Sequence, residues 1–170
     1  MSGKKAKVER YRAPKRTGPE KEVAKGAQAI GPHSWRATFK HERNMCAWLI
    51  ERLELLEPDL ELYEDVRSGK EYACKMPHTR GRIDILAQDR HGGLVVIECK
   101  LGTAGPRALG QLLGYMGWVL EHLCTTGETV RGMLVVGRAS KMLLCAVRAV
   151  PLPIAVYECP LRGKLERVEV

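Results

Sequence analysis

Three ionisable residues, Asp84, Glu98 and Lys100, interrupt two short apolar segments of this 170-residue chain. The segments are GRIDILAQD at 81–89 and GLVVIECK at 93–100, and turn-forming residues separate them. Charged groups in an apolar strand cost desolvation free energy, so we expect a function that needs them there. A surface ion pair between Lys100 and a carboxylate is the structural alternative.

The expected hairpin predicts how these side chains meet. If its turn is centred near His91, antiparallel pairing sets Asp84 opposite Glu98, with their side chains about 5 Å apart. Side chains alternate along a strand, so Glu98 and Lys100 point to one face and Cys99 to the other. Two carboxylates at this spacing can share a divalent cation.

A hard cation such as Mg²⁺ or Mn²⁺ takes oxygen ligands. We expect the carboxylates of Asp84 and Glu98 and the backbone carbonyl of Cys99 to supply them. Such a cation activates water for phosphodiester hydrolysis. Lys100 would then orient the water or stabilise developing charge, a role worth about 10² to 10⁴ in rate.

A helix is expected from about residue 41 to 56, ending before Pro58. Its apolar stripe consists of Cys46, Leu49, Leu53 and Leu56. Glu42 lies on the same side, one turn outside this stripe, which makes it a candidate active-site carboxylate. The alternative is a first-turn Glu that complements the helix dipole.

A second helix is expected over 106–123, with two opposite faces. Leu109, Leu112, Leu113, Met116 and Leu120 form the predicted core face, and the other face carries Arg107, Gln111, Tyr115, Trp118 and His122. Gln111 and Tyr115 would bind a phosphate or Lys100, and Trp118 would stack on a base. An ordinary solvated helix face fits this pattern as well.

Arg80 and Arg82 precede Asp84, so their guanidinium groups, with Arg107 and Trp118, are candidates for nucleic-acid contacts. Solvated arginines are the alternative.

The net charge of +8 also favours a polyanionic partner. Most of that charge lies in residues 1–32, which we expect to form a disordered basic arm before a single domain over 33–170. The arm would attract phosphate or only improve solubility.

The six cysteines form no CxxC pair and have no neighbouring His at ligand spacing, which argues against zinc and iron–sulfur sites. Free buried thiols and the lack of an apolar signal segment near Met1 favour a cytoplasmic location. No stretch approaches the roughly 20 apolar residues of a membrane span. A soluble protein with no membrane partner is therefore expected.

The remaining pattern predicts strands near residues 60–66, 72–75, 130–136, 154–158 and 165–170, and a further helix near 140–149. Together with the hairpin and the two helices above, this order implies an α/β fold. We expect a mixed β-sheet core flanked by helices on both faces.

These residues resemble the PD-(D/E)XK nuclease superfamily. Asp84 and the ExK run at 98–100 match its motif, and QLLGY at 111–115 resembles the QxxxY element of its RecB-like members. Over about 42–158 the chain is similar to the nuclease domain of endonuclease NucS, also called EndoMS. The resemblance implies a restriction-endonuclease-like fold and a Mg²⁺- or Mn²⁺-dependent DNA endonuclease. It also implies an active site of Glu42, Asp84, Glu98, Lys100, Gln111 and Tyr115.

NucS has a separate N-terminal domain for dimerisation and DNA binding, whereas here only the basic arm precedes the nuclease-like region. The arm, a second copy of the chain or a partner protein would then supply substrate recognition. The resulting prediction is a DNA endonuclease of repair, or of the processing of branched, mismatched or single-stranded DNA. A non-catalytic nucleic-acid-binding module and a ribonuclease are the alternatives.

Overall fold

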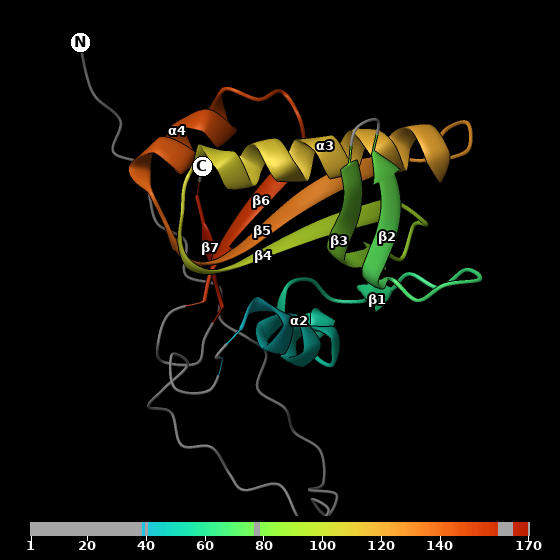
Figure 1. Cartoon of the computed structure of the whole chain (residues 1–170), viewed down its shortest axis with the longest axis horizontal. Helices are drawn as coiled ribbons and strands as arrows, with labels where there is room; N and C mark the ends of the chain where they lie inside the picture. The colour runs from blue at the N-terminus through green and yellow to red at the C-terminus, as the bar shows by residue number, and fades with distance from the viewer. Residues whose placement is uncertain (1–38, 40, 77–78, 160–164, 170) are drawn as a thin grey trace, which may run out of the picture.

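Within the described residues, a seven-stranded mixed sheet carries helices on both faces (Figure 1). The computed structural model describes residues 39, 41–76, 79–159 and 165–169. The predicted basic arm lies outside these residues. The elements are α2 (Glu42–Ile50), a 3₁₀ turn (Leu53–Leu55), β1 (Glu61–Leu62), β2 (Lys70–Met76), β3 (Thr79–Gln88), β4 (Leu94–Ala104), α3 (Pro106–His122), β5 (Val130–Ala139), α4 (Lys141–Arg148), β6 (Ile154–Glu158) and β7 (Glu166–Val168).

The strand order is β1-β3-β4-β5-β6-β7, and β2 also pairs with β3. The β3–β4 hairpin is antiparallel, and β4, β5 and β6 run parallel to one another. Parallel strands need crossover connections, which α3 and α4 provide. The predicted mixed α/β sheet is confirmed.

Each face of the sheet has its own apolar core. Helices α3 and α4 pack on one face, and α2 packs on the other (Figure 1). Strand β4 contributes to both, because Val96 faces α3 whereas Ile97 and Cys99 face α2. All three of these side chains are fully buried. The central strands therefore position their residues rigidly.

Several predicted boundaries were wrong. The α-helix expected over 41–56 ends at Ile50, because Arg52 leaves the helical conformation (φ −147°, ψ 36°) before the 3₁₀ turn. The apolar stripe of the expected helix is nevertheless buried along its whole length. Of the strand expected over 60–66, only β1 forms, while β2 is longer than predicted.

The core face of α3 is also shifted from the predicted one. Leu120, expected in the core, is 57% exposed, whereas Tyr115 is buried. At 100° per residue Leu120 lies about 80° from Leu112, and Tyr115 about 60° away on the other side. A helix buries only part of its circumference against a sheet, so the buried arc centred on Leu112 includes Tyr115 and omits Leu120.

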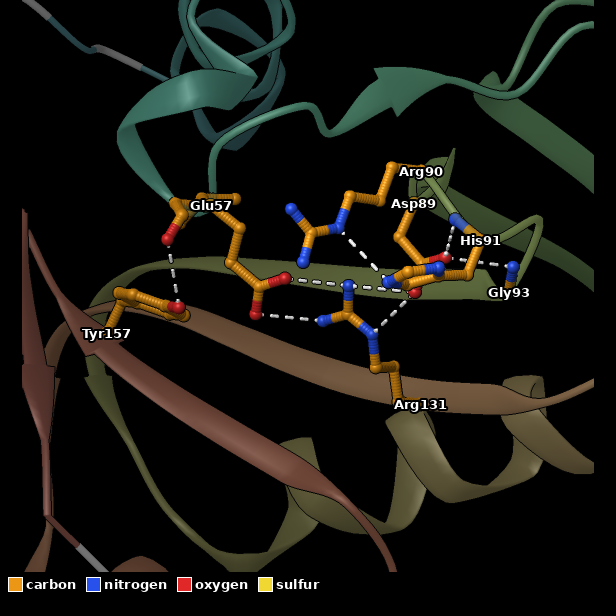
Figure 2. Close-up of polar contacts among 8 residues, drawn as sticks. Glu57, Asp89, Arg90, His91, Gly93, Arg131 and Tyr157 are labelled. Atoms are coloured by element: carbon orange, nitrogen blue, oxygen red, sulfur yellow. Dashed lines mark hydrogen bonds and ion pairs between the residues drawn. The ribbon is translucent and has the colours of Figure 1, made fainter.

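An ion-pair network fixes the turn end of the hairpin (Figure 2). Arg131 of β5 pairs with Glu57 at 2.7 Å and with Asp89 at 3.3 Å. Asp89 Oδ1 also accepts hydrogen bonds from the backbone amides of His91 and Gly93, at 3.0 Å each. These contacts join three segments of the chain and hold the hairpin register.

No helix among the described residues is long and apolar enough to cross a membrane.

Candidate active site

The predicted carboxylate pair lies at the end of the hairpin away from its turn. The paired residues of β3 and β4 run from Gln88 with Leu94 to Ile85 with Ile97. Asp84 and Glu98 lie one step beyond the last of these pairs, where the side-chain alternation of β3 breaks, because Ile83 and Ile85 belong to opposite apolar cores. There the Cys99 amide donates to Asp84 Oδ2 at 2.9 Å, so the carboxylate is fixed against the backbone of β4.

Glu98 is the buried charged residue at the centre of this group. Its exposure is 0%, and Oε1 accepts a hydrogen bond from Lys100 Nζ at 2.7 Å. Its second oxygen, Oε2, is buried without any hydrogen-bond partner. A buried carboxylate oxygen without a partner is costly, and it calls for an ion or water at that place.

Burial sets the electrostatics of the group. Burial, and then the charge of Asp84, raise the pKa of Glu98 to about 7 despite the nearby Lys100. Burial also raises the pKa of Asp84, although the Cys99 amide opposes this. Burial alone would lower the pKa of Lys100, but the hydrogen bond to Glu98 and the neighbouring carboxylates outweigh it and raise that pKa. The carboxylates thus favour a proton or a cation.

Glu42 reaches the same point from α2. Its Oε2 pairs with Lys100 Nζ at 3.4 Å, and its Oε1 accepts from the Leu101 amide at 3.4 Å. The β4–β5 register shifts between Lys100 and Thr103, so Leu101 lies at an irregularity of the strand. Irregularities of this kind are frequent beside active sites. The structure therefore brings Glu42, Asp84, Glu98 and Lys100 together, as expected.

Gln111 and Tyr115 lie on the other side of this group, on α3. Gln111 Nε2 donates to the Tyr115 hydroxyl at 3.3 Å, and the same hydroxyl accepts from the Arg82 amide at 3.3 Å. These contacts hold β3 two residues before Asp84. A hydrogen bond from Gln111 or Tyr115 to Lys100, which the sequence had suggested, is not among the hydrogen bonds of the described residues. Gln111 and Tyr115 instead stabilise the backbone of β3.

The predicted nucleic-acid residues are more scattered. Arg82 is 65% exposed in its side chain and lies 3.7 Å from Glu71, and Arg107 is exposed at the start of α3. Trp118 Nε1 donates to the Lys75 carbonyl at 2.9 Å, and its ring stacks on His122 with 4.7 Å between centroids. Arg80 pairs with Lys75 in the sheet, but its side chain lies outside the described part of the structure.

The oxygen donors of this site suit a hard divalent cation. The charge of Asp84 is close enough to raise the pKa of Glu98, and one oxygen of Glu98 is buried and lacks a partner. Mg²⁺ and Mn²⁺ prefer such oxygen ligands. Asp84 and Glu98 are therefore the residues that would hold the cation, with the Cys99 carbonyl as the expected third donor.

A neighbouring thiol pair was missed from the sequence. Cys46 of α2 and Cys99 of β4 are both buried, and a hydrogen bond with the Cys46 thiol and burial raise the pKa of Cys99. Their sulfur atoms and a carboxylate oxygen of Asp84 lie within 4.8 Å of one another. The two cysteines are far apart in the sequence, so ligand spacing gave no sign of the pair. Cys46 follows Glu42 by one helical turn, and that was the available signal.

Comparison with solved structures supports the fold. A repair endonuclease from Pyrococcus abyssi matches with a TM-score of 0.55 and 24% identity, over 72% of this chain and 49% of that one. A complex of EndoMS with dsDNA matches at 0.55 and 23% identity, over 83% and 51%. EndoMS in its apo form matches at 0.53 and 24% identity, over 72% and 48%.

The chain thus spans about half the length of these solved structures. No curated protein sequence matches it. A model of the family described as the endonuclease NucS C-terminal domain matches residues 41–144, more than half of the chain and all of the catalytic candidates. The chain therefore belongs to the family of the endonuclease NucS C-terminal domain.

Proposed function

We propose that this protein is a metal-dependent endonuclease that hydrolyses phosphodiester bonds in DNA during repair. The observation that carries the proposal is the buried Glu98 carboxylate, whose Oε2 lacks a partner beside Asp84 and Lys100. A fold that needed only an ion pair would not leave that oxygen unpaired. The family and the PD-(D/E)XK-like motif support a nuclease, and the solved EndoMS complex with dsDNA supports DNA as the substrate.

In this proposal Asp84 and Glu98 hold Mg²⁺ or Mn²⁺, helped by the Cys99 carbonyl. The bound cation would lower the pKa of a water molecule and neutralise charge on the scissile phosphate. Asp84 is held for this role by the Cys99 amide. Glu98 is held by Lys100 through Oε1, which leaves Oε2 for the cation.

Lys100 acts on the substrate, and Glu42 positions it. The ammonium lies between Glu98 at 2.7 Å and Glu42 at 3.4 Å, so two carboxylates aim its protons and keep it charged. It would orient the attacking water or stabilise the negative charge that develops on the phosphate. Gln111 and Tyr115 would help to position Asp84, because the Tyr115 hydroxyl binds the β3 backbone at Arg82 and Gln111 donates to that hydroxyl.

The exposed side chains beside the site would guide the nucleic acid. Arg82 and Arg107 are exposed and would contact phosphates. Arg80 and Trp118 remain predicted contacts. The basic arm, a second copy of the chain or a partner protein would supply the recognition of DNA structure.

Cleavage assays test this proposal directly. Wild type, Asp84→Asn, Glu98→Ala and Lys100→Ala would be incubated with labelled single-stranded, duplex, mismatched and branched DNA in Mg²⁺, Mn²⁺ or EDTA. Wild type should cleave only with metal, and Lys100→Ala should be about 10² to 10⁴ slower. Glu51→Gln is the matched control, because Glu51 is a largely exposed carboxylate at the C-cap of α2, the end of the helix opposite to Glu42.

The same assay decides between the alternatives. Metal-dependent cleavage by Glu98→Ala at the wild-type rate would refute the proposed active site. Binding of DNA without cleavage under every metal would favour the non-catalytic module. A parallel RNA substrate that alone is cut would identify a ribonuclease.

A further inference from the structure

The thiol pair under the candidate active site has no role in the proposed hydrolysis. Cys46 and Cys99 come from different elements, α2 and β4, and they meet Asp84 of β3. Cys46 is 4% and Cys99 0% exposed, whereas Asp84 is only partly buried. Two sulfur atoms and a carboxylate oxygen therefore form a group within 4.8 Å that is accessible from the side of Asp84.

This donor set differs chemically from the oxygen donors of the proposed active site. Thiolates are soft ligands that select zinc-like ions, whereas Mg²⁺ and Mn²⁺ prefer oxygen alone. Three protein ligands and a water molecule complete a tetrahedral zinc site. Ligand atoms around such an ion stand about 3.5 to 3.8 Å apart, so from separations within 4.8 Å binding needs a contraction of about 1.3 Å at most.

We propose that Cys46, Cys99 and Asp84 form a second metal site, which binds a thiophilic divalent ion of the Zn²⁺ or Cd²⁺ class. Asp84 belongs to both sites, so a thiophilic ion would withdraw it from Glu98. Occupation of the second site would then inhibit the Mg²⁺-dependent reaction. This inhibitory consequence rests on the proposed function, whereas the binding itself does not.

The position of Cys46 on α2 couples the two sites. Cys46 lies one turn after Glu42, and Glu42 contacts Lys100 and the Leu101 amide. One helix therefore contacts β4 twice, once through the carboxylate that aims Lys100 and once through the thiol. An ion between α2 and β4 would hold this helix against the strand while it removes Asp84 from the catalytic group.

A Cd²⁺ titration of the full chain in a phosphine reductant measures the binding without any substrate. The ultraviolet charge-transfer band of thiolate bound to Cd²⁺ is the readout, and added Zn²⁺ should displace it. Wild type should bind one ion per chain at this site. Cys46→Ser should bind at least about tenfold more weakly, since loss of even an outer-shell partner costs about 10- to 100-fold.

A control variant, Cys145→Ser, and two further variants, Cys46→Ala and Asp84→Asn, keep the test decisive. Cys145→Ser removes an exposed thiol and should leave the tight binding unchanged. Circular dichroism would show whether Cys46→Ser and Cys46→Ala fold. Should neither fold, Asp84→Asn probes the site from its third ligand and should also bind at least about tenfold more weakly. Wild-type affinity in a folded Cys46 variant, or in Asp84→Asn, would overturn the proposal.

An activity assay tests the coupling separately. Zn²⁺ should inhibit Mg²⁺-dependent cleavage by wild type, and Cys46→Ser should need at least about tenfold more Zn²⁺ for the same inhibition. Equal inhibition of both proteins would overturn the shared use of Asp84. If wild type cleaves nothing, the proposed function fails, while the Cd²⁺ titration still decides whether the second site exists.

Discussion

Replacing Glu98 by Gln should remove a pH dependence of stability from the metal-free protein. Burial and the neighbouring Asp84 raise the pKa of Glu98 from 4.5 to about 7. Because the folded value lies above the unfolded one, the folded state retains a proton that the unfolded state releases over this interval. The free energy of unfolding of wild type should therefore fall as pH rises from about 4.5 through 7.

The magnitude follows from the pKa shift of the carboxyl group. One pKa unit corresponds to about 1.4 kcal/mol, so the shift from 4.5 to about 7 amounts to about 3 kcal/mol between pH 4.5 and 8. Glu98→Gln also loses the ion pair with Lys100. The pKa of Lys100 is raised above 10.5, so its charge is constant in this window, and its attraction for the ionised Glu98 is already contained in the Glu98 pKa of about 7.

Urea unfolding in EDTA at several pH values measures this effect. The free energy of unfolding of wild type minus that of Glu98→Gln should decrease by about 3 kcal/mol from pH 4.5 to 8. Glu51→Gln makes the same substitution at a side chain that is 72% exposed, so it should follow the pH dependence of wild type. A difference between wild type and Glu98→Gln that stays constant with pH would refute the argument from burial.

Three further predictions concern the metal, the α3 contact and the ion-pair network. Mg²⁺ at about 100 times its Kd should raise the wild-type free energy of unfolding by about 3 kcal/mol at pH 8. Calorimetry should show a clearly smaller gain for Asp84→Asn at the same Mg²⁺ concentration. An equal gain would exclude Asp84 as a ligand. Tyr115→Phe removes the acceptor of the Arg82 amide and should cost about 1 kcal/mol; urea unfolding and exchange of that amide would show it, and unchanged exchange would contradict it. Arg131→Met leaves Glu57 and Asp89 without their shared cation and should cost about 2 kcal/mol while the metal-saturated cleavage rate stays unchanged; a large loss of rate would contradict a purely structural role.

The hairpin could be predicted because its determinants are local. Turn residues around His91 set which residues of the two strands pair. Because side chains alternate between the two faces of a strand, a register shifted by one residue would turn every side chain to the opposite face. That register predicted that Asp84 and Glu98 lie near each other, and the apolar stripe of its helix predicted Glu42 beside them; the structure places all three around Lys100. The family motif added Gln111 and Tyr115, and the structure places both beside β3.

The remaining features depend on contacts between elements that are distant in sequence. The burial of Tyr115 in place of Leu120 depends on how far α3 is rotated about its axis against the sheet. Helical periodicity in the sequence predicts this rotation only to within tens of degrees. Cys46 and Cys99 meet because α2 packs on the rear face of β4. Arg131 in an apolar strand was a visible signal, but its partners lie 42 and 74 residues away.

The pH dependence of stability also distinguishes a catalytic carboxylate from a structural one. A structural ion pair is satisfied by its own partners, so its removal destabilises the protein over the whole range in which both groups are charged. Glu98 has a partner for one oxygen only, and its burial beside Asp84 makes the ionised form unfavourable. Its replacement should therefore become less destabilising as pH rises, and a bound cation should reverse that trend. The apolar residues on both faces of β4 hold the carboxylate in this unfavourable state, which is the condition for strong binding of a cation there.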